Sequence, residues 1–490
     1  MVSKLSKHAE GTPGRAIIEP AATHNDPLLS GYWHLKGTAG ATKGANVVDV
    51  WDEFRGAGVV IGIIDDGVEY THPDLAPNYD LALDYDGRDN DFDADPSDPA
   101  DRHGTAVAGV AAAALDNATG GAGVAPAASL VGYRIGFNGS AEANLAAVYQ
   151  RVDDLDVANN SWGYDGFLSD NYDAPAFAPI FDGLHNAVET GRDGLGTIIV
   201  FAAGNFRTSG QDVNYHNFQN DRGVITVAAT DSAGNIASFS TPGDAILVAA
   251  PGVSIPTTDR LGGNGGFTVG GYTTLSGTSF SSPLVSGIAA LMLDANPGLG
   301  WRDVQEILAS TAVQTGSIES WSFNHAYDWN GGAMHVSSDF GFGLVDAMAA
   351  VRVAESWRAV SNSANEAVVS NLVTPGLVIP DLGSVQSALV LADGIRIDRV
   401  EVDLTIAHLN ISDLRVVLTS PAGTESVLFN NAPTGQDNIA FTFSTTHDWG
   451  ELSGGEWVLT VSDTRAGVTG TLQGWALRAY GDADANDTYV

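Results

Sequence analysis

Three short polar segments, in the order acid, base, nucleophile, constrain this chain more than any other feature of its sequence. They read Asp65-Asp66-Gly67, Arg102-His103-Gly104-Thr105 and Ser276-Gly277-Thr278-Ser279. Each segment alone is most often a turn, a loop or a helix cap, because a short motif is only a hypothesis. Together they supply a nucleophile, a base to take its proton and an acid to orient the base, which is the set that acyl transfer needs.

The local pattern places each of these residues at the edge of a regular element. Asp65 follows the apolar run 59–64, which predicts a buried parallel strand, and ligands of open α/β sheets collect at the carboxyl ends of strands. His103 precedes a small-residue helix predicted over 104–115. Ser279 begins a helix predicted over 279–293, whose first N–H groups can stabilise an oxyanion. Asn205 follows another buried strand, and its amide can donate to the same oxyanion.

Apolar, β-rich runs alternate with helical patterns in the first two thirds of the chain. Further strands are predicted over 129–135, 155–161, 197–203, 224–229 and 245–250, and further helices over 141–152, 182–190, 279–295, 301–312 and 345–358. This alternation predicts an α/β domain over 24–358, preceded by an N-terminal extension over 1–23. Its parallel sheet should be covered by helices on both faces.

The pattern changes after residue 358. Residues 359–370, rich in Ser, Asn and Ala, predict a linker, and residues 400–406 then alternate strictly between apolar and polar, as in a half-buried antiparallel strand. Similar runs follow at 414–418, 426–429, 439–443 and 457–461. They predict an all-β, jelly-roll-like sandwich over 371–482, with a short tail over 483–490. Such a sandwich is also compatible with an independent binding module, since sandwiches carry many functions.

The motifs resemble those of the subtilisin-like serine proteases, whose triad has the order Asp, His, Ser. They resemble most closely the kexin/furin branch, the proprotein convertases. The segments that carry this resemblance are 64–69 with the doubled acid, His72-Pro73-Asp74-Leu75, Ser161-Trp162-Gly163, 277–283 around Ser279, and Trp301-Arg302-Asp303-Val304. The resemblance covers residues 24–482. It implies a subtilisin-like catalytic domain followed by a P domain that docks on it.

The resemblance implies a serine endopeptidase. Ser279 would attack the scissile carbonyl, His103 would transfer the proton, Asp65 would orient the imidazole, and Asn205 would complete the oxyanion hole. A binding or scaffold protein on a silenced protease fold is the alternative from another class, and the presence of all four residues disfavours it. An esterase would be expected to show Gly-x-Ser-x-Gly, whereas Ser279 lies in Gly-Thr-Ser-Phe-Ser.

The resemblance also assigns residues to substrate binding. Asp66 would face the basic residue just before the cleaved one, although Asp is also a common turn residue. His216 stands where relatives carry the acid that meets a cleaved Arg or Lys, and Gly166 replaces a second acid. Relaxed specificity at the cleaved residue, with a residual preference for basic substrates, is therefore expected. The complete predicted set is Asp66, Ser161, Trp162, Gly163, Asp165, Asp173 and His216.

Eight aspartates lie between residues 84 and 101, at positions 84, 86, 89, 91, 93, 95, 98 and 101. So many like charges favour a bound cation, and closely spaced oxygen ligands suit calcium, with a merely solvated acidic loop as the alternative. The resemblance assigns one Ca²⁺ site to Asp86, Asp91 and Asp93. It assigns another to Asp26, Asp74, Asn117 and the carbonyls of Ala114, Thr119 and Gly121. A further family site near the substrate pocket is not expected, because Gly166 and Thr241 stand at its acidic positions.

Composition limits the partners. The net charge of −37, from 22 basic and 59 acidic residues, argues against nucleic-acid binding and favours basic polypeptide substrates. The chain has no cysteine and hence no disulfide. No apolar run approaches the ~20 residues that a membrane span needs. Residues 1–20 lack the apolar core of a secretory signal, yet the resemblance implies an extracellular enzyme. We expect a monomer.

Overall fold

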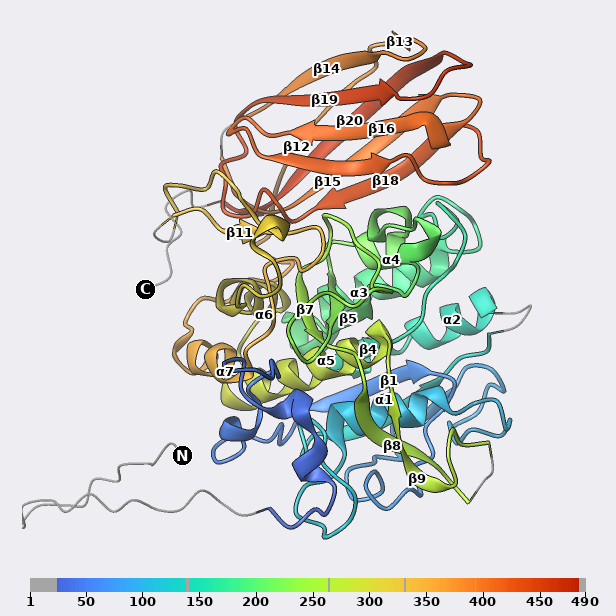
Figure 1. The fold of residues 1–490 in the computed structure, drawn as a ribbon, viewed down its shortest axis with the longest axis vertical. Helices are drawn as coiled ribbons and strands as arrows, with labels where there is room; N and C mark the ends of the chain where they lie inside the picture. The colour runs from blue at the N-terminus through green and yellow to red at the C-terminus, as the bar shows by residue number, and fades with distance from the viewer. Residues whose placement is uncertain (1–23, 138–140, 263–264, 330–331, 393, 484–490) are drawn as a thin grey trace, which may run out of the picture.

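The computed structural model describes residues 24–137, 141–262, 265–329, 332–392 and 394–483. The predicted N-terminal extension (1–23) and residues 484–490 of the predicted tail lie outside the described residues. Figure 1 shows an α/β domain below and an all-β domain seated on top of it. Both parts of the predicted fold class are therefore confirmed.

A seven-stranded parallel sheet forms the centre of the first domain, in the order β2-β3-β1-β4-β5-β6-β7. Its strands are almost wholly buried, as their apolar sequences predict. They are β1 Val60–Asp65, β2 Tyr85–Asp86, β3 Ser129–Arg134, β4 Val157–Asn160, β5 Ile198–Ala202, β6 Val224–Thr230 and β7 Val248–Pro251. Two small antiparallel pairs that the sequence did not predict are β8 Ile255–Leu261 with β9 Gly270–Leu275, and β10 Ser322–Phe323 with β11 His335–Val336.

Helices cover this sheet. They are α1 His103–Ala112, α2 Ala141–Tyr149, α3 Ala178–Gly194, α4 Asn217–Asn220, α5 Thr278–Ala295, α6 Trp301–Thr311 and α7 Ala347–Ser356. Short 3-10 turns add η1 Leu29–Gly31, η2 Trp33–Leu35, η3 Val48–Val50, η4 Val152–Asp154, η5 Arg207–Ser209, η6 Val213–Tyr215, η7 Ile318–Ser320 and, in the second domain, η8 Ile411–Asp413.

Small residues allow α1 and α5 to lie inside the domain. Nine of the ten residues of α1 are buried. A Cβ at Gly109 would lie 2.2 Å from Oγ1 of Thr258, and a Cβ at Gly287 would lie 2.5 Å from Cβ of Val124. Both helices therefore approach their neighbours more closely than a larger residue permits, and this holds the first residues of α1 and α5 at the edge of the sheet.

The second domain is a sandwich of two antiparallel sheets. One has the order β12-β20-β15-β18, with β13 also paired to β20, and the other has the order β14-β19-β16-β17. The strands are β12 Ala367–Val373, β13 Leu377–Ile379, β14 Ser384–Leu391, β15 Arg396–Ala407, β16 Leu414–Thr419, β17 Glu425–Asn430, β18 Ile439–Thr445, β19 Gly455–Asp463 and β20 Gly470–Asp482. Strand β12 begins at Ala367, inside the segment that the sequence predicts as a linker.

The two domains are joined by polar bonds and by two exchanged aromatic side chains. Trp449 of the second domain is 2% exposed and packs in the core of the first, with its ring centroid 5.7 Å from that of Phe342. Tyr215 of the first domain packs in the core of the second. Arg302 of α6 pairs with Asp398 at 2.5 Å and with Asp482 at 2.8 Å. The sandwich is therefore docked on the first domain, as the resemblance implies.

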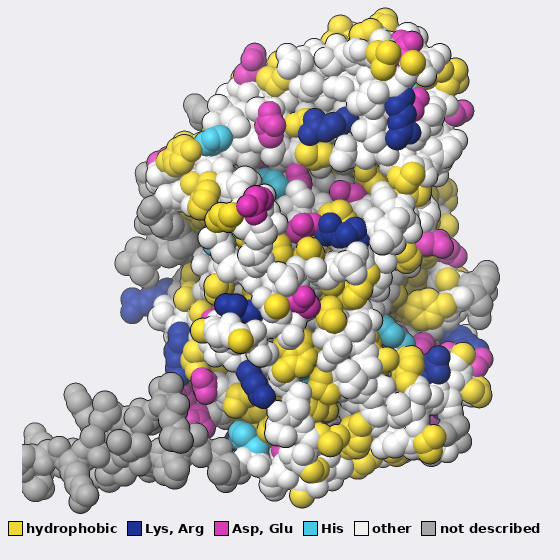
Figure 2. Space-filling model, viewed as in Figure 1, with side chains coloured by type: hydrophobic (Ala, Val, Ile, Leu, Met, Phe, Trp, Pro, Cys, Tyr) yellow, Lys and Arg dark blue, Asp and Glu magenta, His cyan; other side chains and the backbone are white. Residues whose placement is uncertain are grey.

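The charged surface is mixed on the face shown in Figure 2, where Lys and Arg side chains are scattered singly among acidic and apolar ones. In the described part of the chain, no helix combines the length and the apolar character that crossing a bilayer demands.

Candidate active site

The buried Asp65 and the half-buried His103 form an acid–base pair. Asp65 is the last residue of β1 and is 1% exposed, and its two carboxylate oxygens lie 2.9 and 3.0 Å from Nδ1 of His103. Nδ1–H therefore donates to the carboxylate, and this tautomer leaves Nε2 with a lone pair that can accept a proton. The two residues therefore lie together, as the sequence predicts.

Ser279 lies next to this pair, in the first turn of α5. The ring of its neighbour Phe280 has its centroid 5.8 Å from that of His103. The Ser279 hydroxyl donates to the carbonyl of Ser161 at 3.3 Å, and the Ser161 hydroxyl donates to the carbonyl of Ser279 at 3.0 Å. In acyl-transfer enzymes the bond from nucleophile to base often forms only with substrate in place.

Asn205 follows β5 and supplies an amide at the same place. Its Oδ1 accepts from the backbone N–H of Thr278 at 2.9 Å and from the Thr278 hydroxyl at 3.1 Å, which turns Nδ2 the other way. A Cβ placed on Gly277 would lie 3.5 Å from this Nδ2 and 3.7 Å from both Oδ1 of Asn205 and the backbone nitrogen of Ser279. Two donors thus border one small space at the N-terminus of α5, an arrangement suited to an oxyanion.

A cavity of about 200 Å³ opens beside Ser279. Among its lining residues are Ser161, Trp162, Gly163 and His216, all predicted from the sequence, and Tyr164, Gln211, Gln219 and Thr241, which were not. The predicted acids Asp165 and Asp173 are exposed and do not line it. Every lining residue lies in the described part of the chain, and none is Asp, Glu, Lys or Arg.

His216 is paired inside this wall with an acid that the sequence did not point to. Its Nδ1 lies 2.8 Å from Oδ1 of the fully buried Asp170, and its Nε2 lies 3.2 Å from Oε1 of Gln211. Gln211 is oriented by its own amide group, which donates to the carbonyl of Asp165 at 2.7 Å. Both ring nitrogens thus lie within hydrogen-bond distance of an acceptor, so the ring is held from both sides. The cavity wall therefore contains a histidine that is paired with a buried carboxylate.

Two family models match the chain. Residues 56–343 match the Subtilase family, and residues 397–479 match the Proprotein convertase P-domain. The chain belongs to the subtilase family.

Relatives and solved structures agree with this assignment. Furin of Mus musculus is 33% identical over 486 residues, covering 94% of this chain and 58% of furin. The dibasic-processing endoprotease of Schizosaccharomyces pombe is 30% identical over 500 residues, covering 94% of this chain and 66% of that protein. This chain spans less than two thirds of either relative. The predicted kexin/furin-like subtilisin with a P domain is confirmed.

A crystal structure of the serine protease of Aeromonas sobria superposes on this subtilase with a TM-score of 0.83, over 98% of this chain and 99% of that chain. At 21% identity this similarity shows the fold alone.

Asp66 lies beneath the first turn of α1 in this subtilase. Its carboxylate accepts from the backbone N–H groups of Arg102 at 2.9 Å, His103 at 3.0 Å and Gly104 at 2.7 Å, and the residue is 8% exposed. Burial and the charge of Asp65 raise its pKa to about 6, against the opposing effects of His103 and the backbone bonds. These contacts give Asp66 a capping role at the N-terminus of α1, and its assignment to a substrate subsite stays a prediction.

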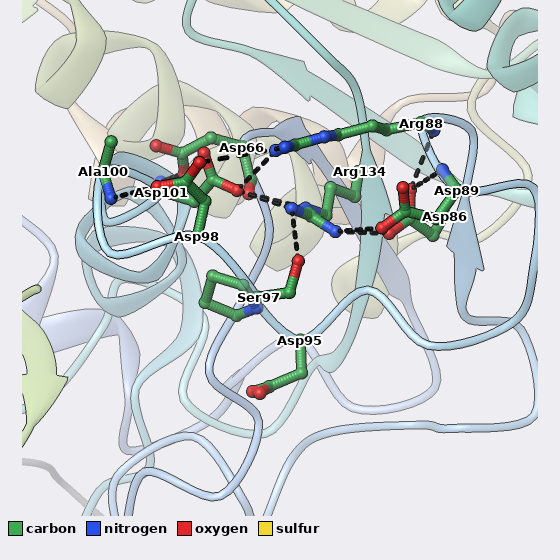
Figure 3. Close-up of polar contacts among 12 residues, drawn as sticks. Asp66, Asp86, Arg88, Asp89, Asp95, Ser97, Asp98, Ala100, Asp101 and Arg134 are labelled. Carbon is green, nitrogen blue, oxygen red and sulfur yellow. Dashed lines mark hydrogen bonds and ion pairs between the residues drawn. The ribbon is translucent and has the colours of Figure 1, made fainter. Parts of the chain in front are cut away.

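Behind Asp66 lies a buried guanidinium that the sequence analysis missed. Arg134 ends β3, and its Nε donates to the Asp66 carbonyl at 3.2 Å (Figure 3). Its other donors reach Asp86 at 2.6 Å, Asp89 at 3.1 Å, Ser97 at 3.0 Å and Asp101 at 2.6 Å. Burial lowers the pKa of Arg134, but its bonds to Asp101 and Asp86 raise it more. A lone Arg in an otherwise apolar strand was the available signal, since a buried Arg requires acidic partners.

The side chains of the predicted calcium set Asp86, Asp91 and Asp93 do not form a metal-binding group in the described residues, although Asp86 and Asp91 pair through their backbones at 3.0 and 3.1 Å. The Asp86 carboxylate bonds Arg134 and the N–H groups of Arg88 and Asp89. Asp91 and Asp93 are exposed, and each accepts from a backbone N–H two residues further on. Over the described ranges, no three His, Cys, Asp or Glu side chains form a group suited to a metal. Arg134 offsets part of the charge of this loop, and the assignment of calcium to these three residues stays a prediction.

Three members of the other predicted calcium set, Asp26, Asp74 and Asn117, lie together. Asp26 and Asp74 are buried, and the loop 114–121 closes around them: Asn117 donates from its backbone to Asp26 at 3.1 Å and from Nδ2 to Asp74 at 2.9 Å. Within the described residues, neither acid has a Lys or Arg partner. The carbonyls of Ala114, Thr119 and Gly121 accept no hydrogen bond from that part of the chain. The two buried carboxylates, together with the unbonded carbonyls of the loop 114–121, fit a hard cation such as Ca²⁺.

We predict an alkaline rise in activity. Burial lowers the pKa of His103, but the charges of Asp65 and Asp66 outweigh it and raise the pKa to about 9. His103 must be unprotonated to take the proton of Ser279, so kcat/KM should rise as the pH rises through this pKa. Asp66→Asn removes one of the negative charges and should move the rise to lower pH. The pH profile of kcat/KM on an uncharged peptide measures this, with exposed Asp52→Asn as control, and an unmoved profile in Asp66→Asn would contradict it.

We also predict that calcium stabilises the protein through Asp26 and Asp74. EDTA should lower Tm and calcium should restore it, because an ion that binds only the folded state stabilises that state by mass action. Asp74→Asn should lose the calcium-dependent shift, and Asp52→Asn should keep it. Differential scanning calorimetry with and without chelator measures these shifts. An equal shift in Asp74→Asn would assign calcium to another place.

Proposed function

We propose that this subtilase is a serine endopeptidase that hydrolyses peptide bonds through Asp65, His103 and Ser279. The observation that carries the proposal is the Asp65–His103 pair lying against the first turn of α5, where Ser279 and the Asn205 amide meet. A silenced scaffold would not need this set to remain intact. We therefore assign catalysis, rather than binding alone, to the cavity beside Ser279.

In the proposed reaction, His103 Nε2 takes the proton of the Ser279 hydroxyl as its oxygen attacks the scissile carbonyl. Asp65 holds the ring in the required tautomer and stabilises the imidazolium. The N–H of Ser279 and the Nδ2 of Asn205 receive the developing oxyanion, a contribution worth about 3 kcal/mol for one donor. His103 then returns the proton to the leaving amine, and water repeats the sequence to release the acyl group.

We further assign a structural calcium ion to the site of Asp26, Asp74 and the loop 114–121. A cation there would neutralise two buried carboxylates and would hold the segment that follows α1. The site lies in the catalytic domain but takes no part in the chemical steps. A calcium requirement and membership of the subtilase family both favour an extracellular enzyme that acts on polypeptides, since calcium is abundant outside cells.

The cavity beside Ser279 supports relaxed specificity at the cleaved residue. A relative is named a dibasic-processing endoprotease, and a basic preference needs a carboxylate that can meet the substrate's charge. Here Asp170, a buried acid next to the wall, is already paired with His216. We therefore expect uncharged side chains to be accepted at least as well as Arg or Lys. The acidic surface, with a net charge of −37, favours substrates that are basic elsewhere.

The proposed activity is tested by active-site labelling. Wild-type protein should react covalently with a fluorophosphonate and should cleave a denatured protein substrate. Ser279→Ala should not label, and its kcat should fall by at least about 10⁴-fold, since the members of a triad act as a unit. A wild-type protein that does not label, or a Ser279→Ala variant that labels equally, would favour the scaffold alternative.

The proposed specificity predicts the effect of changing His216. His216→Gln removes the imidazole that pairs with the Asp170 carboxylate, so cleavage after Arg or Lys should rise about tenfold relative to cleavage after an uncharged residue. A peptide library with one varied position measures the ratio. His185→Gln is the matched control, because His185 forms a similar pair with Asp221 at 2.7 Å outside the cavity. Wild-type cleavage confined to paired basic sites would contradict the proposal.

A further inference from the structure

One wall of the cavity belongs to a loop that lies between the two domains. Residues 211–221, which contain η6 and α4, place His216, Gln211 and Gln219 against the cavity. In Figure 1, α4 lies directly beneath the sandwich, next to β18. The loop carries only short helical turns and no strand. Its position therefore depends on what packs against its other side.

The second domain holds this loop by hydrogen bonds. Asn217 and Asn220 both donate from Nδ2 to the carbonyl of Thr442, each at 2.9 Å. Ser444 donates from its backbone to Oδ1 of Asn214 at 2.9 Å and from its hydroxyl to the carbonyl of Asn220 at 2.6 Å. Thr442 and Ser444 belong to β18, and Asn214, Asn217 and Asn220 belong to residues 211–221, which we call the cavity loop. These bonds fix the loop on both sides of His216.

Tyr215 anchors the same loop in the apolar core of the second domain. Its ring centroid lies 5.0 Å from that of Phe429, and its hydroxyl accepts from the backbone N–H of Asn430 at 3.1 Å. The next residue, His216, lines the cavity. Adjacent residues thus have their side chains in different domains, so a shift of Tyr215 must move His216 through the backbone they share.

The acid that pairs with His216 is held in the same way. Its loop is bonded to the second domain on both sides of Asp170. The carbonyl of Phe167 accepts from the Gln436 amide at 3.0 Å, and the Asn171 amide donates to the carbonyl of Ala440 at 2.8 Å. Both members of the His216–Asp170 pair are therefore flanked by bonds to the second domain. In contrast, Asp65, His103 and Ser279 are carried by β1, α1 and α5 of the first domain alone.

We propose that the second domain positions the primary specificity pocket: Ser444, Phe429 and their neighbours on β17 and β18 hold the loop that places His216 and Asp170. They act as positioning residues, since none of them lines the cavity. This inference rests on the proposed endopeptidase function and adds to it a source of selectivity outside the catalytic domain. Changes at this contact alter which residue is cleaved and leave the triad chemistry in place.

The test compares two contacts between the domains in the full chain. Ser444→Ala combined with Phe429→Leu loosens the cavity loop. Asp398→Asn weakens the Arg302–Asp398 pair on α6, which is another interdomain contact whose residues do not line the cavity. For each variant we would measure kcat/KM on two peptides that differ only at the cleaved residue, the rate of fluorophosphonate labelling, and Tm.

The double variant should change the ratio of the two kcat/KM values by about fivefold, with the change mainly in KM, because small displacements of positioning groups have large kinetic effects. Its labelling rate should stay within about twofold of wild type, since labelling needs only the triad and the oxyanion donors. Asp398→Asn should lower Tm and leave the ratio unchanged. If the double variant does not fold, Gln436→Ala on the exposed rim should change the ratio in the same direction, by less.

An unchanged ratio in folded, labelling-competent variants would overturn this inference and leave the proposed function in place. An equal change of ratio in Asp398→Asn would also overturn it, since the effect would then follow stability rather than the cavity loop. A wild-type protein that neither labels nor cleaves would remove the proposed function, and this inference with it.

Discussion

Opposite charges buried at the carboxyl edge of the parallel sheet hold the catalytic end of this molecule together. Asp65 and Arg134 end two neighbouring strands, β1 and β3, in register with each other. A buried charge without a partner is very costly, so each must be matched locally. Asp65 is matched by His103, and Arg134 distributes its donors between the Asp66 carbonyl and the acidic loop 86–101. The positions of β1, α1 and that loop are therefore interdependent.

The two adjacent acids, Asp65 and Asp66, have different roles at this edge of the sheet. Asp65 holds the His103 ring through Nδ1, whereas Asp66 holds the His103 backbone through its N–H. His103 is thus fixed through both its ring and its main chain. The charge of Asp66 also acts on the ring, because it helps to raise the pKa of His103. One carboxylate orients the base while the other fixes the helix from which it projects.

The sequence alone predicted the structural features that depend on the local pattern of apolar and polar residues. Strands buried on both faces read as apolar runs, so their ends, and with them Asp65 and Asn205, could be located. Strand β12 was missed because most of its residues are exposed or half-buried, which leaves no clear apolar period. Spacing within the acidic loop could not tell which carboxylates point inward: Asp86 faces Arg134, whereas Asp91 and Asp93 stay at the surface. The partner of His216 was missed because Asp170 lies 46 residues away in sequence.

The exchange of Trp449 and Tyr215 means that neither apolar core is complete without the other domain. The triad does not depend on this exchange for its parts, since β1, α1 and α5 come from the first domain. The cavity wall does, because Tyr215 immediately precedes His216 and its ring is buried against Phe429 of the second domain. On the proposed function, reactivity and selectivity therefore have separate structural origins in one chain. The parallel sheet fixes the groups proposed to react, and the contact between the domains shapes the cavity proposed to receive the substrate side chain.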